Sequence, residues 1–200
     1  MILPGRVRQN YEANRRVGTA PAEDSRGLLN GQGRPALSRL RFGYADVGHA
    51  GCESIAVFNA LCLLDRPRPL PEIIRDMEKG GYLRLGGHLG AAPYFEPLLR
   101  RYGTRSRIVT PARLRQEEAR SAGGPGGVYL MVIWNRRWMM HKGLHTFAAE
   151  RTAEGWEVFN RFNDDETSRR YARLDDILLN GRSAGAFLVI YQVFRKEDLS

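Results

Sequence analysis

Cysteine is scarce in this chain of 200 residues, which has only Cys52 and Cys62. If both lie on one helix, ten residues separate them by about 15 Å, which is too far for a disulfide. No hydrophobic run approaches the roughly 18 apolar residues of a membrane span, and the first residues lack the apolar core of a signal peptide. These absences argue against a disulfide scaffold and a membrane protein, and predict a cytoplasmic protein.

Lysine is nearly absent as well. It supplies three of the 31 basic residues and arginine the other 28, which against 22 acidic residues gives a net charge of +9. Such a charge can mark a nucleic-acid binder, but the arginines are scattered through every segment instead of lining one helix. Nucleic acid is therefore not the expected partner. An arginine-rich nucleic-acid binder remains the third interpretation, and it predicts strongly salt-dependent affinity.

Metal-ligating patterns are also missing. The chain has four histidines, His49, His88, His141 and His145. His141 and His145 are four apart, which on a strand separates them by about 13 Å. The glycine-rich segment 86–90 lacks the Lys-Ser/Thr ending of a phosphate-binding loop. Neither a metal nor a cofactor is expected.

The chain divides into two parts by composition. Residues 1–40 carry seven arginines against three acidic residues, with glycine, proline, asparagine and glutamine throughout and little apolar periodicity. This pattern predicts an irregular basic N-terminal arm, which could wrap the domain, lie disordered or cover a cleft. Residues 41–200 are predicted to form one folded domain.

Within 41–200, helical patterns come first and strand patterns later. One helix is predicted to begin at Cys52 and another after Pro111. Further helices are predicted over 71–79 and 92–102, with a short one near 174–179. Strands are predicted over 104–109, 128–134, 144–149, 156–160 and 186–193, and the run 128–134 is apolar enough to be buried on both faces. This order predicts an α+β domain, with a largely antiparallel sheet packed on the helix that Cys52 begins.

Cys52 is the strongest candidate for chemistry, because it follows Gly51 at the start of a strongly apolar helix. The helix dipole and free N–H groups there are expected to lower the pKa of its thiol. A cysteine nucleophile also needs a base and a group that orients it. His145 is the only histidine in a predicted strand, and Asn160 ends the next strand, where its side-chain amide could accept the ring N–H. Asn163, with Asp164 behind it, is the fallback.

The order of these segments resembles the papain-like cysteine peptidases, and most closely the bacterial branch that processes double-glycine leader peptides of bacteriocins. The resemblance rests on segments 51–61, 86–93, 144–148 and 158–160. It spans roughly residues 43–193, and it comes from the order and setting of short motifs. It implies a papain-like fold and a cysteine peptidase without a cofactor, acting on a peptide or protein substrate such as a leader peptide.

By this resemblance Cys52 is the nucleophile, His145 the general base and Asn160 the orienting residue. The backbone N–H of Cys52 would help to stabilise the oxyanion. Papain-like enzymes usually carry glutamine about six residues before the cysteine, whereas this chain has Asp46. Another group, such as Tyr44 or a backbone N–H, would then serve the oxyanion, or turnover would be weak.

Several alternatives stay open. The chain can be a catalytically weak or inactive peptide-binding protein of the same fold, and a cysteine transferase or deamidase would use the same three residues. Each candidate residue also has a structural interpretation: a buried thiol, a core histidine, and an asparagine in a turn. The basic, aromatic segment 134–142 just before His145 predicts either a peptide-binding wall or an ordinary hairpin tip.

Overall fold

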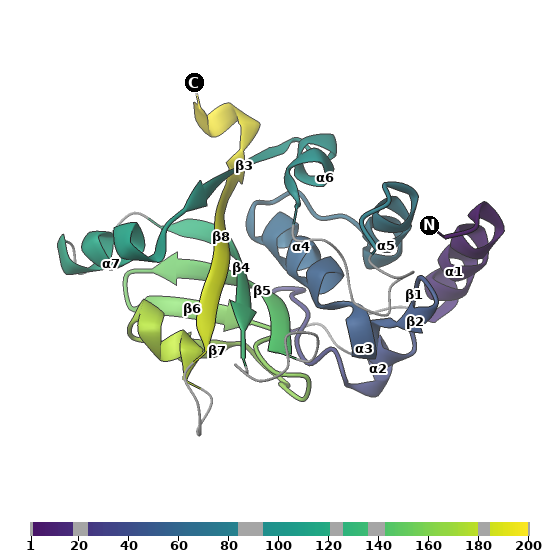
Figure 1. Ribbon diagram of the computed structural model, residues 1–200, viewed down its shortest axis with the longest axis horizontal. Helices are drawn as coiled ribbons and strands as arrows, with labels where there is room; N and C mark the ends of the chain where they lie inside the picture. Colours follow the sequence, from purple (N-terminus) through teal and green to yellow (C-terminus); the bar gives the residue numbers. More distant parts are fainter. Residues whose placement is uncertain are drawn as a thin grey trace.

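The computed structural model describes residues 2–17, 24–83, 94–120, 126–135, 143–179 and 185–199. They form a mixed α+β structure with helices before and an antiparallel sheet after the middle of the chain, as the sequence predicts (Figure 1). Of the expected sites, His88, His141 and most of the segment 134–142 lie outside the described residues, as does segment 86–93.

The main sheet has six strands in the order β3-β8-β4-β5-β6-β7, and every neighbouring pair is antiparallel. The strands are β3 (Thr104–Val109), β4 (Gly127–Trp134), β5 (Leu144–Thr152), β6 (Gly155–Phe159), β7 (Arg169–Tyr171) and β8 (Ala186–Arg195). A small separate ribbon pairs β1 (Arg41–Phe42) with β2 (Ala45–Asp46). Tight turns connect β5 to β6, which places the residues after β6 beside the start of β5.

The described helices are α1 (Pro4–Val17), α2 (Pro35–Ser38), α3 (Val47–Ala50), α4 (Cys52–Leu63), α5 (Leu70–Lys79), α6 (Glu96–Arg101) and α7 (Pro111–Arg120), with 3-10 turns η3 (Leu174–Leu178) and η4 (Lys196–Leu199). Figure 1 shows α4, α5 and α1 following one another outward from the sheet, with α4 next to it. α4 packs against β5 and β4, α5 against α4, and α1 against α5.

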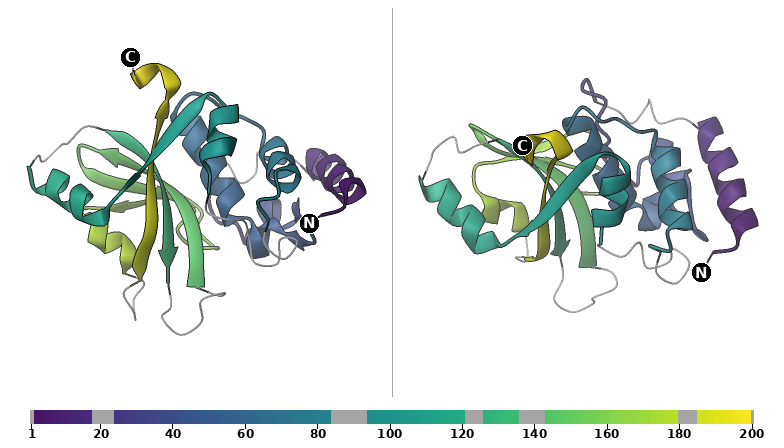
Figure 2. Two further views of the ribbon diagram at one scale, coloured as in Figure 1. Left: turned by 45° about the horizontal axis from the view of Figure 1, so that its top comes forward. Right: turned by 90° about the horizontal axis from the view of Figure 1, so that it is seen from above.

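Both faces of the sheet are covered, which confirms the expectation for the apolar run in β4. Side chains of β4 alternate between two clusters: Leu130 lies among the residues of α4, α5 and α6, and Met131 lies with α7 and η3 on the opposite face. The same alternation along β5 puts Ala148 on the α4 face and Phe147 on the other. Two views from other directions show α7 and η3 on the far side of the sheet from α4 (Figure 2). The sheet therefore forms a rigid platform between two helical layers.

Residues 1–40 differ from the irregular arm expected above. Residues 4–17 form α1, whose inward face carries Val7, Asn10 and Asn14 instead of a full apolar stripe. Asn10 Nδ2 donates to the Gly43 carbonyl (2.8 Å) and to Glu78 (2.6 Å), so a polar face is buried by hydrogen bonding. A search for apolar periodicity misses such a helix.

Residues 28–32 are part of the core. Leu28 and Leu29 are buried, and the side chain of Asn59 on α4 exchanges two hydrogen bonds of 2.8 Å with the backbone N–H and carbonyl of Leu29. Asn59 thus ties the segment at Leu29 to a largely apolar helix. The boundary predicted at residue 40 has no structural counterpart, because the domain begins well before it.

Within the described ranges, none of the helices combines the length and the apolar character needed to cross a bilayer.

Candidate functional site

Cys52 is the first residue of α4, and its thiol is almost fully buried, with 9 % of the residue exposed. The sulfur donates a hydrogen bond to Glu53 Oε2 (3.2 Å), and the backbone N–H of Thr146 on β5 donates toward the sulfur. The start of α4 therefore lies against the start of β5. This brings Cys52 next to the backbone of the residue that follows His145.

The pKa of Cys52 is raised well above its usual range, in contrast to the lowering expected from the helix dipole. Burial is the main cause, and the Glu53 carboxylate raises the pKa further. The backbone N–H groups of Thr146 and Glu53 act in the opposite direction but do not prevail. At neutral pH the thiol is therefore protonated.

His145 is also buried, and its Nε2 lies 2.6 Å from the main-chain oxygen of Asn160. A carbonyl oxygen only accepts hydrogen bonds, so Nε2 must carry the proton and Nδ1 is the acceptor of the neutral ring. The main-chain oxygen of Asn160 thus sets the ring tautomer. The contact comes from the main chain, and not from the side-chain amide that the sequence analysis assigned to it.

Burial lowers the pKa of His145 to about 4; the Asn160 hydrogen bond and Asp165 raise it, while Arg161 lowers it further. The imidazole is therefore neutral at physiological pH. Among the described residues the thiol's hydrogen bond goes to Glu53, and none joins it to the His145 ring. The resting site holds a neutral thiol and a neutral imidazole on neighbouring elements.

The buried, neutral His145 predicts acid instability. The unfolded chain binds a proton near pH 6.5, whereas the folded chain binds it only near pH 4, so stability is lost as the pH falls through this window. The loss amounts to about 3 kcal/mol for this single group. We expect urea unfolding at pH 4 to 7 to show this slope for the wild type and a flatter dependence for His145→Gln.

The matched control is His49→Gln, because His49 is exposed on α3. Burial raises the pKa of Glu78, which acts in the opposite direction, so the difference between variants isolates His145. Equal slopes for the wild type and His145→Gln would show that His145 is protonated as easily in the folded chain as in the unfolded one.

The side chain of Asn160 binds a residue that the sequence analysis missed, Gln32. The backbone N–H of Gln32 donates to Asn160 Oδ1 (2.9 Å), and Asn160 Nδ2 donates to Gln32 Oε1 (3.2 Å). Gln32 Nε2 in turn donates to the carbonyl of Gly48 on α3 (3.1 Å). Gln32 is 3 % exposed and so belongs to the site's interior. Its position between two glycines in a polar segment was the available signal.

Asn160 holds its contacts in a left-handed backbone conformation, with φ of 58°. Asparagine tolerates this conformation better than most residues. Its backbone N–H donates to Asn30 Oδ1 (2.8 Å), so Asn30 and Gln32 hold Asn160 from one loop. That loop therefore fixes the carbonyl that orients His145.

Asp46 and Tyr44, the residues assigned to the oxyanion region, make other contacts in the structure. Asp46 caps the N-terminus of α3, accepting from the backbone N–H of His49 (2.8 Å). Tyr44 is 43 % exposed, with the Arg6 guanidinium 5.7 Å from its ring. The fallback residues Asn163 and Asp164 are exposed on the loop after β6. The structure instead groups His145 with Asn160 and Gln32. The alternation along β5 places the His145 ring beside Phe147, on the face of the sheet opposite to α4, so Cys52 meets the backbone of Thr146 and not the His145 ring.

A buried cation lies behind the histidine. Arg161 is 1 % exposed, donates through Nε to the Ile177 carbonyl (3.0 Å), and has no hydrogen-bond partner for Nη1 or Nη2 within the part of the chain that the structure describes. Its guanidinium lies 4.5 Å from the Phe162 ring centre. This charge helps to keep His145 neutral.

In the described ranges, no three His, Cys, Asp or Glu side chains gather in an arrangement that could ligate an ion.

Comparison with protein-family models, curated proteins and solved structures finds no match to this chain.

Proposed function

We propose that this protein is a papain-like cysteine hydrolase that cleaves a peptide or amide bond through an acyl-enzyme, using Cys52 and His145 and needing no cofactor. The observation that carries the proposal is the junction of α4 with β5. There Thr146 donates to the Cys52 sulfur, and Asn160 fixes the proton of the adjacent His145 on Nε2. The cytoplasm is the proposed location, and a peptide or protein, such as a leader peptide, the proposed substrate.

The protonation states define the catalytic steps. In the catalytic step the His145 ring has to reach the sulfur from its place beside Phe147, on the opposite face of β5. Its free Nδ1 then takes the thiol proton as the sulfur attacks the carbonyl carbon, and the carbonyl electron pair moves to its oxygen. His145 then gives the proton to the leaving amine as the C–N bond breaks, and a thioester to Cys52 remains. Water, activated by the same nitrogen, hydrolyses the thioester and restores the thiol.

Two donors are proposed for the oxyanion. The backbone N–H of Cys52 lies at the start of α4, where N–H groups have no partner within the helix. Gln32 can supply the second, because one Nε2 proton goes to Gly48 and an amide has two. Gln32 then takes the role that the sequence analysis sought at Asp46 or Tyr44.

The direct test is a search for amide-bond cleavage. A proteome-derived peptide library, incubated with the wild type and read by mass spectrometry for new termini, is expected to give cleavages that a Cys52→Ala blank does not. The same spectra report conversion of glutamine to glutamate, which would identify a deamidase using the same residues. No difference between wild type and blank would refute the hydrolase.

The contact between Cys52 and Glu53 suggests a second measurement. Glu53→Gln removes the negative charge that raises the pKa of the thiol, so alkylation of Cys52 by iodoacetamide at pH 8 is expected to become several-fold faster. Mass spectrometry of the Cys52 peptide measures the rate. Glu78→Gln is the matched control, because Glu78 is buried equally well on α5. Equal acceleration in both variants would mean general loosening rather than a charge effect.

The alternative is a catalytically weak or inactive peptide-binding protein with this fold. One observation favours it: the Cys52 thiol donates a hydrogen bond to Glu53 and its pKa is raised, so little thiolate exists at neutral pH. This alternative predicts that peptides bind without being cleaved, and that Cys52→Ala binds them as tightly as the wild type.

A further inference from the structure

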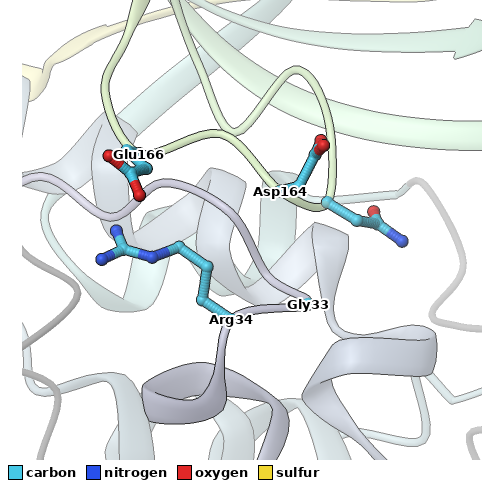
Figure 3. A pocket seen from close by; sticks show the side chains of 5 residues that line it. Gly33, Arg34, Asp164 and Glu166 are labelled. Atoms are coloured by element: carbon cyan, nitrogen blue, oxygen red, sulfur yellow. The ribbon is translucent and has the colours of Figure 1, made fainter.

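A pocket of about 380 Å³ opens to solvent beside the candidate site. Figure 3 shows the side chains that line it, from two loops that face each other. They are Gly33, Arg34, Asn163, Asp164 and Glu166. One loop follows Gln32 and the other follows Asn160, and these two residues are hydrogen-bonded to each other in the candidate site.

The two loops are held together at close range. Gly33 donates from its backbone N–H to the Asn163 carbonyl (2.8 Å), and a Cβ on Gly33 would meet that oxygen at 3.0 Å. The neighbouring bond from the Gln32 N–H to Asn160 Oδ1 continues this seam into the site. The carbonyl of Asn160 then contacts His145. The pocket and His145 therefore share one continuous hydrogen-bonded framework.

The charge of the pocket is opposite to that of the protein. Two carboxylates, Asp164 and Glu166, line it against one guanidinium, that of Arg34, whereas the whole chain carries +9. Within the described ranges, neither carboxylate forms a hydrogen bond or a salt bridge. Arg169, whose charge interacts with that of Asp164, forms its ion pair with Asp165 (2.6 Å).

Unpaired carboxylates in a pocket attract a cation from outside. In a chain with this excess of arginine, most other acidic side chains of the described residues are paired with one, as Glu117 and Asp175 are. Two that stay unpaired on the loops beside a catalytic site favour a positively charged ligand group. Asparagine at 163 and the backbone at Gly33 add polar atoms, and none of the described residues that line the pocket has a large apolar side chain. A long, cationic side chain fits this chemistry.

We propose that this pocket is the specificity subsite of the hydrolase, and that it receives a lysine or arginine side chain of the peptide substrate. The inference rests on the proposed function, because it names the substrate class of the same site. Asp164 and Glu166 bind the cation, and Arg34 limits the pocket to one net negative charge. Substrates with a basic residue near the scissile bond are preferred.

The test uses pairs of acetylated, amidated hexapeptides that contain either arginine or citrulline at one position, scanned along the peptide. Citrulline keeps the shape of arginine but has no charge. Binding to Cys52→Ala is measured by calorimetry at low salt, so that no turnover intervenes. At one position, arginine is expected to bind about tenfold more tightly, because the cation meets two partly solvated carboxylates. Salt is expected to weaken this preference.

Three variants locate the effect. Asp164→Asn combined with Glu166→Gln is expected to abolish the preference, and Arg34→Gln to strengthen it. Glu12→Gln combined with Glu154→Gln changes the net charge equally at two exposed positions outside the pocket, and is expected to leave the preference unchanged. Equal affinity for arginine and citrulline peptides, or binding of neither up to the solubility limit, would overturn the proposal. So would a preference that survives in the pocket variant.

The outcomes separate this inference from the proposed function. Cleavage by the wild type without any preference for basic residues would remove the subsite and leave the hydrolase. A preference for arginine in binding, without cleavage in the peptide library, would leave the pocket as the recognition site of a peptide-binding protein and remove the hydrolase.

Discussion

Cys52→Ser is expected to lower the turnover of any peptide found in the library by at least about a thousandfold. Serine is close to cysteine in size and can keep the hydrogen bond to Glu53, so the buried start of α4 is expected to stay folded. The hydroxyl is a far weaker acid than a thiol, and a histidine with a pKa of about 4 is a weak base. A reaction that relies on this pair cannot compensate for the loss of sulfur.

The control for this variant is Cys62→Ala. Cys62 lies ten residues further along the chain, near the end of α4, and its half-buried side chain packs against the core. Turnover by Cys62→Ala is expected to stay within about twofold of the wild type, with thermal unfolding measured for both variants to verify folding. A Cys52→Ser variant that keeps a tenth of the activity would remove Cys52 from the nucleophile role.

Gly31→Ala is expected to destabilise the protein by about 3–5 kcal/mol, which for this chain length lowers the melting temperature by about 10 °C. Gly31 has φ of 67°, where an L-residue costs about 1–2 kcal/mol. An added Cβ would also lie 2.2 Å from the Asp165 carbonyl oxygen, so the backbone of one loop has to move. Because Gln32 follows directly, activity is expected to fall as well.

Gly103→Ala separates the two causes. Gly103 has φ of 75°, but a Cβ there would meet no atom within 4 Å. This variant is expected to be destabilised only by the backbone strain, about 1–2 kcal/mol, and to keep its activity. If calorimetric melting shows the same loss for both variants, the contact between the loop at Gly31 and the loop at Asp165 does not limit stability.

The strands and the central helices could be predicted because local patterns carry them. β3 spans Thr104–Val109 as expected, and α5 ends at Lys79 before two glycines, also as expected. Both depend on periodicity and on residues that end helices, which act over a few positions. α1 was missed because its buried face uses asparagines. Their partners, the Gly43 carbonyl and Glu78, lie far away in the sequence.

The site shows the same limit. Cys52 and His145 could be singled out because each lies at a recognisable point of a helix or a strand. The contact through the main chain of Asn160 could not, because it depends on a φ of 58° that tertiary hydrogen bonds from Asn30 and Gln32 hold in place. The raised pKa of Cys52 could not be predicted either, since burial against β5 outweighs the local effect of the helix start.

The bonds from Asn30 and Gln32 to Asn160 join positions 130 and 128 residues apart. During synthesis the first loop leaves the ribosome long before its partner exists, so the carbonyl that orients His145 cannot be fixed until β6 has been made. Contacts of such separation form late, because closing a long loop costs entropy before any contact repays it. The nascent chain therefore carries Cys52 through most of synthesis before β5 can cover it and before His145 can be oriented, so the proposed activity can arise only when most of the protein is complete.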